Sequence, residues 1–148
     1  MVENVVFMNM CRITDAQGRW LMQERCDENY PGVIFPGGHV EANESFHDAI
    51  IREIREETGL TVEAPRLRAI RHWSEDQTHY VILMYTAERC SGTLRSSPEG
   101  RVFWATRDEV AQMRQVSDLQ DMIATYDNPD CDECFYRDDG TSYVTEYY

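Results

Sequence analysis

The sequence lacks the features of disulfide-rich secreted proteins and of membrane proteins. Its five cysteines are odd in number and scattered, which is not the pattern of a paired disulfide framework. No apolar run approaches the roughly 20 residues that cross a bilayer, and the segment Val2–Phe7 has no basic leader. We therefore expect a protein of the reducing cytoplasm that does not act at a membrane.

Two of the cysteines, Cys131 and Cys134, have the C-x-x-C spacing of a zinc-ligand pair. A zinc site would need a second pair near them, and none of the four histidines forms an H-x-x-x-H pattern. The sequence therefore favours two ordinary thiols in a C-terminal segment, with zinc as the lesser alternative.

Basic residues are scarce as well. The chain carries 14 Lys and Arg against 27 Asp and Glu, for a formal charge of -13. Such a chain repels nucleic-acid backbones and anionic membranes, because contact releases no counterions. It also repels a free nucleotide polyphosphate, so a nucleotide substrate would need divalent cations to bridge the two like charges. The charge therefore favours a metal-loaded small-molecule site and no nucleic-acid partner.

What is present fits one domain over residues 1–148, since 42% of the residues are hydrophobic and no interdomain linker interrupts the chain. Alternating or apolar runs predict strands at 2–14, 20–25, 33–35, 67–73, 80–87 and 102–104, with a terminal hairpin near 134–144. The turn signal Asp15–Gly18 predicts that the first two strands pair as a hairpin. Helices are expected from Ser45 to Gly59, from Thr106 to Met113, and after a cap at Ser117. This order predicts an α/β fold in which helices cover a mixed sheet.

The helix from Ser45 to Gly59 carries three glutamates, Glu53, Glu56 and Glu57, at positions i, i+3 and i+4. Side chains at this spacing emerge on one helix face and repel one another unless they are compensated. Arg52, one turn before Glu56, offers part of that compensation. Taken alone, such a cluster is most often a solvated helix face.

The residues before this helix change that interpretation. Gly37 and Gly38 leave the main chain open to close approach by a metal or a phosphate. Glu44 lies at the helix entrance, where it can orient Arg52 and fix the loop. Three carboxylates together with a main-chain carbonyl are hard oxygen donors that suit Mg²⁺ or Mn²⁺.

The pattern Gly38-x₅-Glu44-x₇-Arg52-Glu53-Ile54-Arg55-Glu56-Glu57-Thr58-Gly59-Leu60 resembles the complete Nudix box over 23 residues. The order of the flanking strands also resembles the Nudix fold. This resemblance implies an α/β/α sandwich with a mixed central sheet and a Nudix hydrolase activity.

In that family the loop and helix bind divalent cations, and water attacks a phosphorus of a nucleoside diphosphate linked to another group. The resemblance implies metal ligands at Gly37, Glu53, Glu56 and Glu57, with Arg52 and Glu44 completing the catalytic set. The metal lowers the pKa of a bound water, and a carboxylate takes its proton. Glu53 is one candidate base, and Glu99 matches a late catalytic or ligand glutamate of some members. A plain solvent-exposed loop acid is an equal alternative for Glu99.

Four residues are candidates for binding the substrate. Gly38 brings main chain to the phosphates, and Arg25 matches a phosphate-contacting position of MutT-like members, with a rim salt bridge as its alternative. Phe35 resembles the residue that packs near the base, although it is equally consistent with plain core. Asp118 matches a purine-reading position, while capping of the last helix is the stronger alternative.

The MutT-like interpretation makes a nucleoside triphosphate pyrophosphohydrolase the leading hypothesis, with 8-oxo-dGTP as the leading substrate. The proline typical of ADP-ribose hydrolases is replaced by Asp76, and Tyr80 is late for the tyrosine of dinucleoside-polyphosphate hydrolases. Hydrolysis of ADP-ribose, NADH or dinucleoside polyphosphates remains the alternative. A non-catalytic nucleotide sensor is the less favoured one. The family also allows a homodimer. The number of metals stays open.

Overall fold

The computed structural model describes residues 3–148, so Val2, the first residue of the first predicted strand, lies outside the described residues. The strands are β1 (Asn4–Ile13), β2 (Trp20–Arg25), β3 (Gly32–Ile34), β4 (Leu60–Glu63), β5 (Arg66–Glu75), β6 (Thr78–Ala87), β7 (Arg89–Gly92), β8 (Gly100–Ala105), β9 (Glu133–Asp138) and β10 (Tyr143–Tyr147). The helices are α1 (Phe46–Thr58), α2 (Arg107–Ala111) and α3 (Leu119–Asp127). Within this described part, no helix is long and apolar enough to span a membrane.

The central sheet has five strands in the order β1-β6-β5-β9-β10. It is mixed: β1 pairs with β6 and β5 with β9 in parallel, whereas β5–β6 and β9–β10 are antiparallel. A second sheet, β3-β2-β8, and a two-stranded ladder, β4-β7, complete the strands. The predicted α/β class with a mixed sheet is confirmed.

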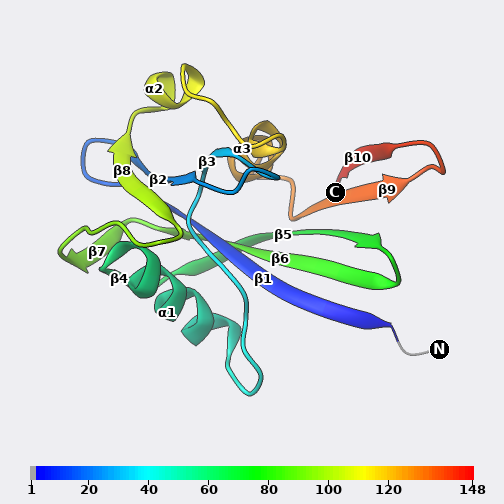
Figure 1. Cartoon of the computed structure of the whole chain (residues 1–148), viewed down its shortest axis with the longest axis horizontal. Coiled ribbons are helices and arrows are strands. Elements are labelled where there is room, and N and C mark those ends of the chain that lie inside the picture. The colour runs from blue at the N-terminus through cyan, green and yellow to red at the C-terminus, as the bar shows by residue number, and fades with distance from the viewer. Residues whose placement is uncertain (1–2) are drawn as a thin grey trace.

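Helices cover both faces of the central sheet, with α1 on one side and α3 on the other (Figure 1). On the α3 side, Met10, Met84 and Ala69 pack with Leu119 and Met122 of the helix in one apolar cluster. A second cluster, on the α1 side, joins the central sheet to α1 and to the second sheet; it includes Cys11, Leu83, Ile50, Ile54, Leu21 and Val102. Neighbouring residues of a strand face opposite sides, so β1, β5 and β6 each contribute to both clusters.

Helix α1 begins and ends as predicted. The Ser45 side chain accepts a hydrogen bond from the Asp48 N–H at 3.0 Å, and Gly59 closes the helix in the left-handed conformation with φ 79°. Ile50 and Ile54 are fully buried beneath it. Glu53 and Glu56 lie outside this buried set, whereas Glu57 belongs to it.

The predicted hairpin between the first two strands is wrong. β1 and β2 share only one bridge, Thr14–Trp20, and belong to different sheets. The edge of β1 that a hairpin partner would need is taken by the segment 36–40. Cys11 N–H donates to the Pro36 carbonyl at 2.9 Å and Asn9 N–H to the Gly38 carbonyl at 2.8 Å. This pairing places the two glycines against β1.

Smaller differences concern short elements. Strands β4 and β7 were not predicted, and α2 ends at Ala111 rather than Met113. Asp118, not Ser117, occupies the N-cap position of α3, and its side chain makes no capping hydrogen bond. The Asp118 carboxylate is therefore free to point elsewhere.

Strand β5 presents different chemistry on its two sides. Arg71 and Trp73 line a cavity, whereas His72 belongs to a chain of polar contacts. His72 Nδ1 lies 2.8 Å from His79 Nε2, and His72 Nε2 lies 2.7 Å from Glu133 Oε1. This chain ties β5 to β6 and β9.

Candidate active site

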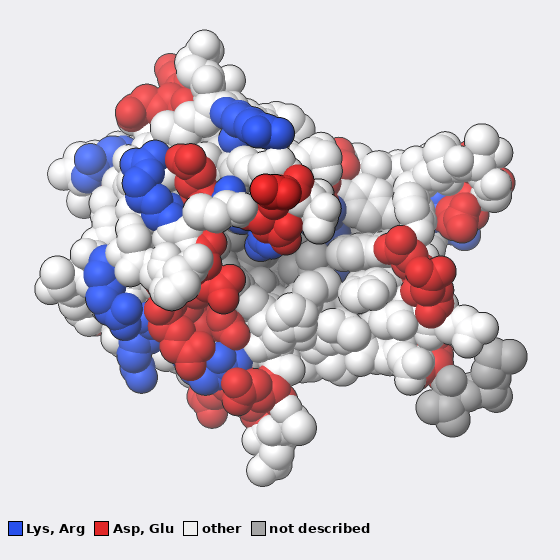
Figure 2. Space-filling view, in the orientation of Figure 1, with Lys and Arg blue, Asp and Glu red and all other residues white. Residues whose placement is uncertain are grey.

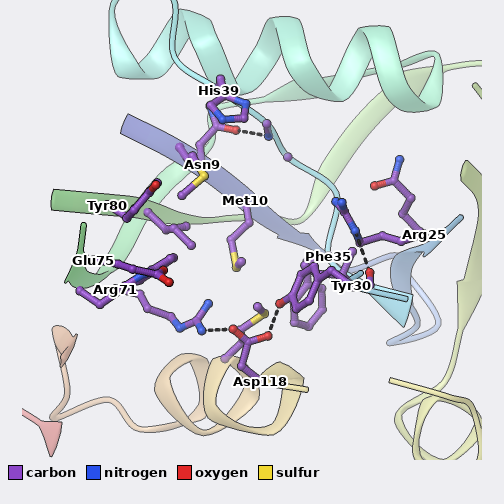
Figure 3. A pocket seen from close by; sticks show the side chains of 18 residues that line it. Asn9, Met10, Arg25, Tyr30, Phe35, His39, Arg71, Glu75, Tyr80 and Asp118 are labelled. Atoms are coloured by element: carbon purple, nitrogen blue, oxygen red, sulfur yellow. Dashed lines mark hydrogen bonds and ion pairs between the residues drawn. The ribbon is translucent and has the colours of Figure 1, made fainter. Parts of the chain in front are cut away.

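A cavity of about 470 Å³ opens between the central sheet, the loop before α1 and the start of α3 (Figure 3). One end is formed by Gly37, Gly38 and Arg25, beside the acidic helix; we call it the catalytic end. The other end is formed by Arg71, Trp73, Asp118 and neighbouring aromatic residues; we call it the inner end. Figure 2 shows acidic side chains gathered over α1 beside a hollow on the same face.

Arg52 organises the acidic face of α1. Its guanidinium donates to Glu44 Oε1 at 2.6 Å, to Glu53 Oε1 at 2.9 Å and to Glu56 Oε2 at 3.1 Å. It also donates to the His39 carbonyl at 2.9 Å, so it fastens the loop to the helix. The structure contains the predicted contact by which Glu44 orients Arg52. One cation thus holds the carboxylates that would otherwise repel each other.

Glu57 lies deeper than the other acids, with only 6% of the residue exposed. The Gly37 N–H donates to its Oε2 at 3.2 Å. Burial, followed by the negative charge of Glu53, raises the pKa of Glu57 to about 8, and Glu99 adds to this effect. Glu57 is therefore a carboxyl group for which a nearby cation would be strongly favourable.

Gly38 allows the loop to pass very close to Glu53. A Cβ atom at position 38 would overlap the Glu53 carboxylate. The Gly38 N–H donates to Asn9 Oδ1 at 2.9 Å, and its carbonyl accepts from the Asn9 N–H. Pro36 and Gly38 thus have occupied carbonyls, while that of Gly37 accepts no hydrogen bond from the described residues.

The donor set of Gly37, Glu53, Glu56 and Glu57 fits a hard divalent cation in its chemistry. The side chains do not converge as a ready metal cage: within residues 3–148, no group of three or more His, Cys, Asp or Glu meets that geometry. Arg52 holds Glu53 and Glu56, and the Gly37 amide holds Glu57. A cation would compete with these contacts for the same oxygens.

The remaining predicted residues at the catalytic end are Arg25 and Glu99. Arg25 lines the cavity, donates to the Tyr30 carbonyl at 3.1 Å and lies 3.3 Å from Asp27. Arg25 therefore forms the ion pair at the cavity rim, and it also lies at the end of the cavity where Gly37 and Gly38 lie. Glu99 lies in the exposed loop before β8, and its charge acts on Glu57.

Phe35 and Asp118 belong to the inner end. Phe35 is buried and packs edge-on against Trp20 and Tyr126 at ring-centroid distances of 5.5 and 5.4 Å, so it is core that also lines the cavity. The Asp118 carboxylate accepts hydrogen bonds from Tyr30 and from Arg71 (Figure 3). It contacts these two residues in place of capping α3.

Arg71 is the main residue of the inner end that sequence reasoning missed. Only 1% of its side chain is exposed. Its guanidinium lies over Trp73 and Tyr136 at 5.6 and 4.7 Å and donates to the Tyr136 hydroxyl at 2.9 Å. Although burial lowers the pKa of Arg71, the Asp118 carboxylate outweighs it and the net direction is upward. Arg71 is therefore a buried cation, and an arginine inside the predicted strand 67–73 was the available signal.

Comparison with protein families matches residues 7–126 to the NUDIX domain. Among curated relatives, a MutT-like protein of Streptomyces ambofaciens is 33% identical over 101 residues, covering 68% of this chain and 63% of that protein. The "Putative 8-oxo-dGTP diphosphatase YtkD" of Bacillus subtilis is 45% identical over 47 residues, covering 32% of this chain and 28% of that protein. The matched part thus spans less than two thirds of the length of either relative.

A solved structure of the MutT protein from Bacillus halodurans has the same fold. It superimposes with a TM-score of 0.74 at 23% identity, covering 95% of this chain and 97% of that chain. At this identity the likeness concerns the fold alone.

Proposed function

This chain belongs to the Nudix hydrolases and is a MutT-like member, and we propose that it hydrolyses purine nucleoside triphosphates in a Mg²⁺-dependent reaction. Oxidised purines such as 8-oxo-dGTP are the substrates that we propose first. The nucleoside monophosphate and pyrophosphate would be the products. We further propose that Gly37, Glu53, Glu56 and Glu57 bind the metal.

The observation that carries this proposal is the single cavity that joins the two ends described above. Gly37 and Gly38 lie at one end beside the carboxylates, and Arg71, Trp73 and Asp118 lie at the other. Its volume of about 470 Å³ falls within the usual range for small-molecule sites. A nucleotide laid along it would place its phosphates at the glycines and its base against the inner end.

Mg²⁺, when bound, would neutralise phosphate charge and lower the pKa of a water molecule. Arg52 keeps Glu53 and Glu56 on one face, and its contact with the His39 carbonyl holds the loop in place. Glu53 and Glu57 are the carboxylates nearest the two glycines. We propose Glu53 as the base that accepts the proton of the attacking water.

A purine preference is supported by the inner end. Each Asp118 oxygen already accepts one hydrogen bond, from Tyr30 or from Arg71, and a carboxylate oxygen has a second lone pair for an N–H donor. The edge of guanine offers two such donors. Trp73 and Tyr80 stack at 5.3 Å and both line the cavity, which suits a flat base. The name of the relative YtkD points to the same substrate class.

We also propose that all 148 residues act as one domain. The family match ends at residue 126, yet β9 pairs with β5 and extends the same sheet. Tyr136 of β9 contacts Arg71 in the cavity wall. The part beyond the family match thus contributes to the proposed base site.

One substrate panel tests the proposal. We expect kcat/KM to be highest for oxidised purine triphosphates, with no turnover in excess chelator and recovery on addition of Mg²⁺. ADP-ribose, NADH and dinucleoside polyphosphates are the matched competitors. A higher kcat/KM for any of these would reject the triphosphate assignment, and binding of nucleotides without turnover would indicate a sensor.

A further inference from the structure

Two buried amide groups lack a hydrogen-bond acceptor among the described residues. They are Asn9 Nδ2 and Gln23 Nε2, and both residues line the cavity. Asn9 is 4% exposed and Gln23 is 3% exposed. Buried polar atoms are nearly always paired, so these two unpaired donors on one cavity are available to acceptors that enter it.

The orientation of the Asn9 amide follows from its contacts. Asn9 Oδ1 accepts the Gly38 N–H at 2.9 Å, which fixes the oxygen toward the loop (Figure 3). A flipped amide would bring two donors together, so the nitrogen must be the unpaired atom. Asn9 therefore offers an N–H₂ group next to the two glycines.

Gln23 lies on the other side of the same segment. Its strand β2 pairs with β3, with Gln23 opposite Ile34, and the chain then runs through Phe35 to Gly38 beside Asn9. Its Cγ would be 3.4 Å from a Cβ at Gly100, which follows Glu99 directly. Asn9 and Gln23 therefore lie on the two strands that flank the segment 34–38, and both line the cavity.

Neutral donors suit this end of the cavity. The carboxylates Glu53, Glu57 and Glu99 lie close by, and a further cationic side chain would pair with them. An amide N–H can instead donate to a phosphate oxygen and leave the carboxylates free. Hydrogen bonds to a charged acceptor are also the stronger ones.

We propose that Asn9 Nδ2 and Gln23 Nε2 donate hydrogen bonds to oxygens of the phosphate next to the nucleoside, and so position the nucleotide for hydrolysis. This inference rests on the proposed function, because it places the phosphates at the Gly37–Gly38 end. It makes Asn9 and Gln23 substrate-positioning residues outside the Nudix box.

The test compares binding of dGMP with that of deoxyguanosine, by calorimetry in Mg²⁺. Asn9→Asp keeps the oxygen that accepts from Gly38 and removes the donor; Gln23→Met removes the donor at similar length. We expect each variant to bind dGMP at least about tenfold more weakly, with less than a twofold change for deoxyguanosine. The matched controls are Asn128→Asp, in which an exposed Oδ1 accepts the Asp130 N–H at 3.0 Å, and Gln120→Met on the exposed side of α3.

Equal weakening of dGMP and deoxyguanosine would overturn the inference, because the amides would then face the base or the sugar. Unchanged dGMP binding in both variants would overturn it as well. Thermal unfolding of each variant separates these results from loss of fold. If the wild-type chain hydrolyses no nucleoside triphosphate, the proposed function fails; if it does so and the variants bind dGMP normally, only this inference fails.

Discussion

The two ends of the cavity are built in different ways. At the catalytic end, the two glycines and the glutamates of the loop and α1 come from one continuous stretch, Gly37 to Glu57, and Arg52 holds Glu44, Glu53 and Glu56. Arg25 joins them from β2. At the inner end, Asp118 meets Arg71 and Tyr30 from positions 47 and 88 residues away. The first is acidic and largely shielded from solvent, whereas the second centres on a buried cation.

In the proposed function, this difference separates cleavage from recognition. At the catalytic end, a loop and a helix that follow each other are held by local contacts and by the pairing of the segment 36–40 with β1. The inner end depends on β5, α3 and β9 being in place together. Substitutions at one end should therefore change catalysis, and substitutions at the other should change the choice of nucleotide.

The largest effect is expected for Glu57→Gln. Removing this carboxylate should lower kcat by on the order of 10³, because it would take away a metal ligand. Hydrolysis of the best triphosphate is measured at saturating Mg²⁺. Glu63→Gln on the exposed end of β4 serves as the control. Turnover of Glu57→Gln close to that of wild type would remove Glu57 from the metal site.

The substitution Asp118→Leu removes the carboxylate that Tyr30 and Arg71 contact at the inner end. We expect the ratio of kcat/KM for purine over pyrimidine triphosphates to fall by about 30-fold, with an unchanged requirement for Mg²⁺. Stability should fall too, since Arg71 would remain buried without its carboxylate.

The double variant Asp118→Leu/Arg71→Met sharpens this prediction. Removing both charges should restore much of the stability, because no unpaired charge is then buried, while the purine preference stays lost. Thermal unfolding and the same kinetic ratio are the two measurements. A preference that returned with stability would mean that the pair only supports the fold.

A smaller effect concerns pH in the presence of chelator. In the folded chain, burial and the charge of Glu53 raise the pKa of Glu57 from its ordinary value of 4.5 to about 8. Between these values the unfolded chain has lost the proton that the folded chain still holds, so stability is greatest at low pH and falls as pH rises. The loss due to this group should be about 1.4 kcal/mol per pH unit within the window.

The comparison of wild type with Glu57→Gln isolates this group, since the glutamine does not titrate. Denaturant unfolding across the window should show the two stabilities diverging in favour of the variant as pH rises. Parallel curves would contradict the raised pKa of Glu57.

The same contrast explains what the sequence could predict. Helix α1, its Ser45 cap, its Gly59 end and the contacts of Arg52 with Glu44 and Glu56 follow from short spacings in the sequence, so they were predicted correctly. The contacts of Arg52 with Glu53 and the His39 carbonyl were not predicted. The partner of β1 could not be predicted, because the turn Asp15–Gly18 signals a reversal without saying which edge the next strand joins. The segment 36–40 occupies that edge.

The contacts of the inner end could not be predicted from the sequence for a related reason. The sequence identifies Asp118 as a candidate, but it does not show that Arg71 and Tyr30 contact this carboxylate in place of the helix end. Those contacts depend on how β5 and α3 pack, and no local spacing encodes them. The same holds for Asn9 and Gln23, because their amides line one cavity only after β1 and β2 have packed on the two sides of the glycine loop.

The chain of contacts from His79 through His72 to Glu133 has a practical consequence. His72 follows Arg71 and precedes Trp73 on β5, so its ring lies on the side of the strand away from the cavity. Its two ring nitrogens are held at 2.8 and 2.7 Å from their neighbours, and small displacements of β5 change both contacts. Nitrogen-15 resonances of this imidazole would therefore serve as an intrinsic NMR reporter of nucleotide binding, with no label inside the site.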